Sequence, residues 1–69
     1  MQKKINDTIN ELKALGWDCT KSTPTEILLV KGDHVINMIP SGVFWVDGDK
    51  STTYTIRDLK KKKFARLGY

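Results

Sequence analysis

The first part of the chain alternates apolar and polar residues with the period of an α-helix. Apolar residues recur at spacings of three and four positions, at Ile5, Ile9, Leu12 and Leu15, and polar residues fill most positions between them. Gly16 follows at once and suits the left-handed C′ position of a Schellman ending, in which Trp17 contacts Leu12. The pattern predicts an amphipathic helix that buries one stripe and ends at Gly16.

The middle of the chain has the pattern of β-strands separated by turns. Residues 26–31 form an apolar run, Gly32-Asp33 has the composition of a two-residue hairpin turn, and apolar residues return over 34–39. Pro40-Ser41-Gly42 then interrupts the chain, and residues 43–46 predict a third strand. Three antiparallel strands make a stable sheet when helices cover one face.

The sequence of two segments is compatible with more than one secondary structure. Residues 17–25 combine a short alternation with a Ser-Thr-Pro-Thr turn signal, which is typical of either a connector or an edge strand. Residues 51–56 can form a fourth strand, because Thr52, Tyr54 and Ile56 alternate with polar residues, or they can lead straight into the last helix.

The C-terminal segment carries helix signals at both ends. Thr55 and Asp58 have the spacing of a capping box. Gly68 fits a C′ position, with Tyr69 placed to contact Phe64. The expected apolar arc of this helix consists of Ile56, Leu59, Phe64 and Leu67, and Lys60 and Lys63 point into the same arc. The sequence therefore predicts a single α+β domain over residues 1–69, in the order helix, three-stranded antiparallel sheet and basic C-terminal helix (α-β-β-β-α).

Positive charge is concentrated at one end of the chain. The formal net charge is +4, yet residues 1–56 hold six lysines against seven acids and sum to −1. Residues 57–69 sum to +5, because only Asp58 opposes Arg57, Lys60, Lys61, Lys62, Lys63 and Arg66. Such a run attracts polyanions by neutralising phosphates. We expect these six residues to contact nucleic acid, DNA or RNA, or an acidic protein surface; the alternative is a solvated helix end that complements the helix dipole.

Two adjacent aromatic residues mark a second candidate surface. Phe44 and Trp45 lie on one short strand, so one side chain should face the helices and the other should face away. The outward residue can stack on a base or anchor a protein interface. This face supports an alternative function: a small inhibitor or adaptor of the kind that mobile elements such as phages encode, binding a host or defence protein. Self-association through this face, or its coverage by residues 17–25, are the other interpretations.

The residue types used in catalysis are sparse. His34 is the single histidine and has no second ligand or carboxylate pair nearby in the sequence. Cys19 is the single cysteine and is expected to be a structural thiol. Asp47-Gly48-Asp49 has the composition of a turn and lacks the spacing of a calcium loop. We therefore predict no catalytic residues, no metal site, no cofactor and a function based on binding.

The predicted order of elements resembles that of double-stranded-RNA-binding domains and of the HicA toxins. Lys31-Gly32-Asp33-His34 is similar to the Lys-Gly-Ser-His stretch in which HicA toxins place a catalytic histidine, and Gly16-Trp17 ends the first helix in a similar way. The resemblance implies an RNase toxin as a minor alternative, with His34 at the catalytic position.

Length and hydropathy bound the remaining possibilities. A chain of 69 residues buries a thin core, so packing or oligomerisation must stabilise it. The longest apolar run is Ile27–Val30, far shorter than the roughly 20 residues of a membrane span. The N-terminal sequence MQKKINDTIN has no apolar signal region. We expect a cytoplasmic protein with no membrane partner.

Overall fold

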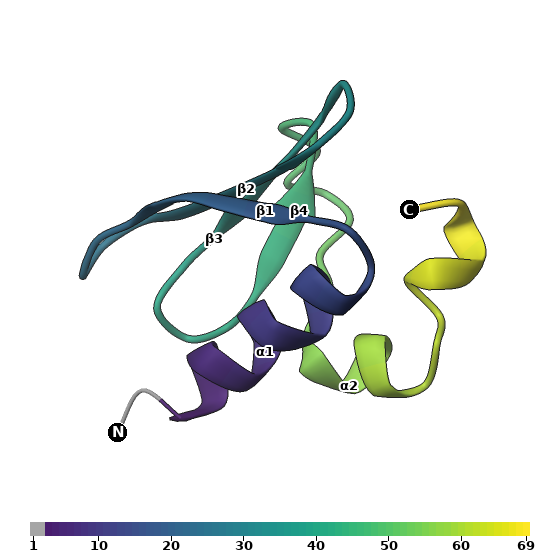
Figure 1. The fold of residues 1–69 in the computed structure, drawn as a ribbon, viewed down its shortest axis with the longest axis horizontal. Coiled ribbons are helices and arrows are strands. Elements are labelled where there is room, and N and C mark those ends of the chain that lie inside the picture. The colour runs from purple at the N-terminus through teal and green to yellow at the C-terminus, as the bar shows by residue number, and fades with distance from the viewer. Residues whose placement is uncertain (1–2) are drawn as a thin grey trace.

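The protein folds as an antiparallel sheet with helices on one side (Figure 1). The computed structural model describes residues 3–69, and side chains from residue 5 onward. The elements, in chain order, are α1 (Lys3–Ala14), β1 (Asp18–Ser22), β2 (Ile27–Lys31), β3 (His34–Met38), β4 (Phe44–Val46), α2 (Ile56–Lys60) and the 3-10 helix η1 (Ala65–Leu67). The four strands form a meander in the order β1-β2-β3-β4. The α+β class is confirmed, with four strands in place of the predicted three.

Helix α1 ends as its sequence predicts. Gly16 adopts φ 99°, its N–H donates to the Lys13 carbonyl at 3.0 Å, and the Trp17 N–H donates to the Leu12 carbonyl at 3.1 Å. These are the two hydrogen bonds of a Schellman motif. Leu12 and Trp17 are both buried in the core.

Across the described residues, no helix has the length and apolar character needed to cross a membrane.

The additional strand comes from the segment with two interpretations, residues 17–25. Strand β1 pairs antiparallel with β2, from Asp18 opposite Val30 to Ser22 opposite Ile27. The register shifts between Cys19 and Lys21, which is a bulge at the free edge of the sheet. A bulge and a lysine on an edge strand oppose further strand pairing. The edge-strand interpretation is therefore confirmed.

Residues 51–56 do not form the alternative fourth strand. Tyr54 makes one isolated bridge to Phe44, with backbone hydrogen bonds of 2.8 and 3.0 Å. The next residue, Thr55, is already the N-cap of α2, and its N–H donates to the Asp58 carboxylate at 2.9 Å. Because this N–H is used by the capping box, strand pairing stops at Tyr54.

The core lies between the sheet and the helices. Strand residues alternate in burial, so Leu29, Ile36 and Phe44 are fully covered on the inner face. The apolar residues of the helical layer that meet them are Ile9, Leu12, Trp17, Leu59 and Phe64. Phe44 is thus the inward member of the aromatic pair, and Trp45 is the outward one.

The prediction of one continuous C-terminal helix is wrong. Helix α2 ends at Lys60, and Lys62 adopts the left-handed conformation with φ 65°. The Lys62 N–H donates to the Leu59 carbonyl at 3.1 Å, and the Lys63 N–H donates to the Asp58 carbonyl at 3.0 Å. This is a complete Schellman motif with lysine, not glycine, at C′. The chain then continues through a turn into η1.

The break has a physical cause: in one continuous helix, lysines and apolar residues of this segment would share the same side. A continuous helix would place Lys60 and Lys63 on the same side as Leu59 and Phe64, and buried ammonium groups are costly. With the break, Leu59 is 4% and Phe64 0% exposed, and both lysines are exposed. Leu67, expected in the apolar arc, is instead 57% exposed.

Candidate functional site

The basic segment, residues 57–66, presents its cations to solvent. Its six positive residues are all exposed: Arg57, Lys60, Lys61, Lys62, Lys63 and Arg66. None of them takes part in an ion pair among the described residues, where the pairs are Lys21–Glu26 and His34–Asp47. Asp58, the one acid of the segment, uses its carboxylate to accept the Thr55 N–H. The positive charge of the segment is therefore available to a partner.

Aromatic packing anchors the basic segment to the core. Phe64 is fully buried and contacts four rings: Phe44 edge-to-face with centroids 5.4 Å apart, Tyr54 at 5.0 Å, Tyr69 stacked at 5.0 Å, and Trp17 tilted at 6.2 Å. The Lys31 ammonium donates to the Leu15 carbonyl at 2.8 Å and to the Tyr69 carbonyl at 2.7 Å. The segment that carries the exposed cations is therefore packed against the rest of the fold on both sides of the turn at Lys62.

The turn at Lys62 changes how the charge is displayed. In a continuous helix the four lysines would be spaced by about 100° around one axis. In the structure Lys60 closes α2, Lys61 and Lys62 form the turn, and Lys63 lies beyond it. The positively charged side chains therefore follow a bend of the chain and do not lie along one helix. Helix α2 itself has only five residues.

The outer sheet face is the second candidate surface. It consists of the strand residues that alternate with the core, namely Leu28, Val30, Val35, Asn37 and Trp45. Val35 is 38% exposed, and Lys50 places its ammonium 5.6 Å from the centroid of the Trp45 ring. Residues 18–22 extend the sheet sideways as β1, so they do not cover this face. The helices and the basic segment pack on the opposite face.

His34 has a carboxylate partner that the sequence did not reveal. Its Nδ1 lies 2.8 Å from Asp47 Oδ2, and the Val35 N–H donates to Asp47 Oδ1 at 3.0 Å. These hydrogen bonds, that of His34 first, hold the pKa of Asp47 below its ordinary value of 3.8. The sequence neighbour Asp33 makes no such contact, because the partner is set by the β3–β4 register, which pairs Ile36 with Val46. A correct prediction of that register from the sequence would have identified Asp47 as the partner of His34.

The His34–Asp47 pair connects secondary-structure elements. It links the start of β3 to the turn after β4, and the Tyr69 ring meets the imidazole edge-to-face at 5.1 Å. A carboxylate-oriented imidazole is one component of acid–base sites. The nearby ammonium of Lys31 is already held by two carbonyls. The arrangement stabilises the end of the sheet where the C-terminal segment docks.

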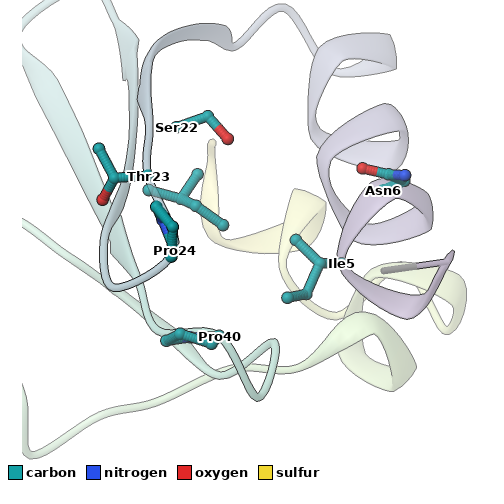
Figure 2. A pocket seen from close by; sticks show the side chains of 7 residues that line it. Ile5, Asn6, Ser22, Thr23, Pro24 and Pro40 are labelled. Carbon is teal, nitrogen blue, oxygen red and sulfur yellow. The ribbon is translucent and has the colours of Figure 1, made fainter. Parts of the chain in front are cut away.

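The remaining features carry less chemistry. Cys19 is half-buried and packs against the core. Within residues 3–69 no cluster of three or more His, Cys, Asp or Glu side chains could hold a metal ion. An open pocket of about 360 Å³ lies between α1 and two turns of the sheet. Figure 2 shows the side chains that line it. Its lining has no ionisable side chain and comprises Ile5, Asn6, Ser22, Thr23, Pro24, Ile27 and Pro40.

Comparison with known proteins gives no relative from which to transfer a role. A scan against protein-family models finds no match, and searches of curated proteins and of solved structures find no significant similarity. The function has to be argued from the residues of this chain.

Proposed function

We propose that the protein is a small binding module that contacts the phosphate backbone of nucleic acid through its basic segment. The observation that carries the proposal is the set of six exposed cations, none of them ion-paired within the described chain, in ten consecutive residues. Lysine and arginine side chains neutralise phosphates, and the release of counterions drives such binding.

The composition of the segment favours nucleic acid over an acidic protein. Residues 60–63 are four consecutive lysines with no apolar residue between them. Lysine is depleted in protein–protein interfaces, whose energy comes mainly from buried aromatic and arginine anchors. A phosphate backbone needs no such anchor, since closely spaced cations are sufficient for affinity.

The shape of the segment favours binding that does not depend on base sequence. Reading of the major groove usually requires a helix or a β-ribbon that enters it. Helix α2 has five residues and ends in the Lys62 turn. Lysines on a bend can follow a phosphate backbone, and they carry little base specificity.

The test is fluorescence anisotropy with labelled DNA and RNA oligonucleotides of unrelated sequence over a series of salt concentrations. We expect similar affinity for unrelated sequences, with log affinity falling by about 0.9 per neutralised phosphate for each unit of log salt on duplex DNA. Replacing Lys60, Lys61, Lys62 and Lys63 by Gln should weaken binding to all oligonucleotides. The salt slope should fall by about one for each phosphate that the variant no longer neutralises.

A matched pair of variants separates local contact from overall charge. Lys60→Gln with Lys63→Gln, and Lys13→Gln with Lys50→Gln, each reduce the net charge from +4 to +2. All four lysines are exposed. We expect the first variant to lose much more affinity than the second. Equal losses of affinity in the two variants would mean that only net charge matters. Binding to an acidic protein without binding to any oligonucleotide would instead assign the segment to a protein partner.

A further inference from the structure

Five of the six cations of the basic segment form two groups, one on each side of the turn at Lys62. The first group, Arg57, Lys60 and Lys61, lies on α2 and its C-cap, where the Lys61 N–H donates to the Arg57 carbonyl at 3.1 Å. Residues at spacings of three and four share one face of a helix. These three side chains are exposed, whereas Leu59 on the other side of α2 is buried.

The second group lies on a separate helical turn. The Arg66 N–H donates to the Lys62 carbonyl at 3.1 Å, and the Leu67 N–H donates to the Phe64 carbonyl at 3.1 Å. This turn carries Lys63 and Arg66, and both side chains are exposed. Figure 1 shows that η1 does not continue the line of α2. The two groups of cations are therefore carried on two different helical axes.

Core packing fixes the second group relative to the first. Phe64 follows directly after Lys63, is fully buried, and has its ring centroid 5.0 Å from that of Tyr54. Leu59, the buried residue of α2, belongs to the same core. Since Lys60 and Lys63 are three residues apart, their Cα atoms lie within roughly 11 Å of each other. The segment thus presents two preorganised groups of positive charge a short distance apart.

The basic segment lacks the stacking residues of a single-strand site. Proteins that bind single strands combine cations with aromatic side chains on which the bases stack. Within residues 57–66 the one aromatic residue, Phe64, is 0% exposed. The half-buried Tyr54 and Tyr69 pack their rings against it, and Trp45 lies on the other face of the sheet. The cations can bind phosphates, but the segment offers the bases of a single strand no surface to stack on.

From these observations we infer that the ligand of the basic segment is double-stranded nucleic acid, with the two groups on phosphates of opposite strands across a narrow groove. This inference rests on the proposed function. The minor groove of B-form DNA is about 6 Å wide, and the major groove of A-form RNA is also narrow. A narrow groove has an enhanced negative potential that attracts lysine and arginine. A duplex holds its phosphates in place, so fixed cations bind it without the cost of ordering a flexible strand.

Fluorescence anisotropy compares duplexes of about 20 base pairs, one of DNA and one of RNA, with each of their separate strands. We expect at least about tenfold tighter binding to a duplex than to either of its strands. Tighter binding to either duplex supports the inference, and the preferred duplex identifies the groove. Equal affinity for duplexes and single strands would overturn the inference and leave the proposed function intact, whereas binding to no oligonucleotide would overturn both.

Uncharged linkages show whether both strands are contacted. Two DNA duplexes carry the same number of neutral methylphosphonate linkages, either all in one strand or alternating with phosphates in both strands. Contacts to both strands predict binding about fivefold tighter to the alternating duplex, because each group of cations still meets phosphates. A segment that follows one backbone would prefer the duplex with one intact strand. That reverse order, or equal affinity, would overturn the inference.

A matched pair of variants assigns the two-strand contact to the two groups. Lys63→Gln with Arg66→Gln removes the second group, and Lys13→Gln with Lys50→Gln is the control, because each pair reduces the net charge from +4 to +2. We expect the first variant to lose the preference for the alternating duplex and the control to keep it. Circular dichroism checks that both variants are folded. A folded Lys63, Arg66 variant with an unchanged preference would refute the assignment of one group to each strand.

Discussion

Replacing Gly16 by valine tests the junction between α1, β2 and the C-terminal segment. Gly16 adopts φ 99°, a conformation that side chains with a Cβ rarely adopt. A Cβ built at this position lies 3.4 Å from Cε and 3.8 Å from Nζ of Lys31. The branches of valine extend further, so the Lys31 side chain has to move. Lys31 is the residue whose ammonium holds the Leu15 and Tyr69 carbonyls.

The expected decrease in stability is large for a domain of this size. The left-handed conformation costs an L-residue about 1–2 kcal/mol. Each hydrogen bond that Lys31 can no longer make adds about 1 kcal/mol. The sum, about 3–4 kcal/mol, is a large part of the roughly 3–10 kcal/mol available to 69 residues. Urea denaturation followed by tryptophan fluorescence should show a midpoint lower by on the order of 2–3 M.

Gly42 provides the matched control. Its φ of 95° is nearly that of Gly16, and a Cβ built there meets no atom within 4 Å. Gly42→Val should therefore show the conformational cost without displacing Lys31, and Gly16→Asn should be milder than Gly16→Val because asparagine tolerates this region. If Gly16→Val lowers the midpoint no more than Gly42→Val, the role given to Lys31 is refuted; an unchanged midpoint would refute the capping itself.

Three further predictions concern other parts of the fold. Lys62→Gly should stabilise the protein by about 0.5–1 kcal/mol in thermal denaturation, because glycine adopts the left-handed conformation without strain and its additional loss of backbone entropy costs less than that strain. A lower melting temperature would contradict the Schellman assignment. The lowered pKa of Asp47 contributes stability that is present above its unfolded value of 3.8 and is lost as the pH falls through the folded value. Asp47→Asn should therefore make melting temperature less dependent on pH between about 5 and 2, and a pH profile identical to that of the original protein would exclude this contribution. Phe44→Ala should cost about 3–5 kcal/mol by leaving a cavity, whereas Trp45→Ala should leave a folded chain by circular dichroism, and unfolding of both would contradict the outward position of Trp45.

The candidate surfaces could be predicted from the sequence only in part. The charge of the basic segment follows from composition, and the outward position of one aromatic residue follows from strand alternation. Which aromatic residue points outward depends on which face of the sheet the helices cover. The Asp47 partner of His34 depends on strand register, since 13 positions separate the two residues in the chain.

Short-range patterns by themselves determined the C-terminal end of α1, the N-terminal cap of α2 and the β2–β3 hairpin. In each case the residues that form the hydrogen bonds are close to one another in the chain, as with Trp17 after Leu12 or Asp58 after Thr55. Gly32 with φ 59° makes the two-residue turn, and Asp33 keeps a negative φ, which defines a type II′ turn. Such features depend on local sterics and local hydrogen bonds, so the sequence contains their signal.

Only the tertiary structure decided the fourth strand and the break at Lys62. The segment of β1 is polar and ambiguous, and it becomes a strand because the apolar β2 beside it offers an unpaired row of backbone groups. Lys62 is neither glycine nor asparagine, so no local signal marks a left-handed residue. The chain turns there because Leu59 and Phe64 must both reach the core while the lysines between them remain in water, and that requirement exists only once the sheet and α1 have defined where the core is.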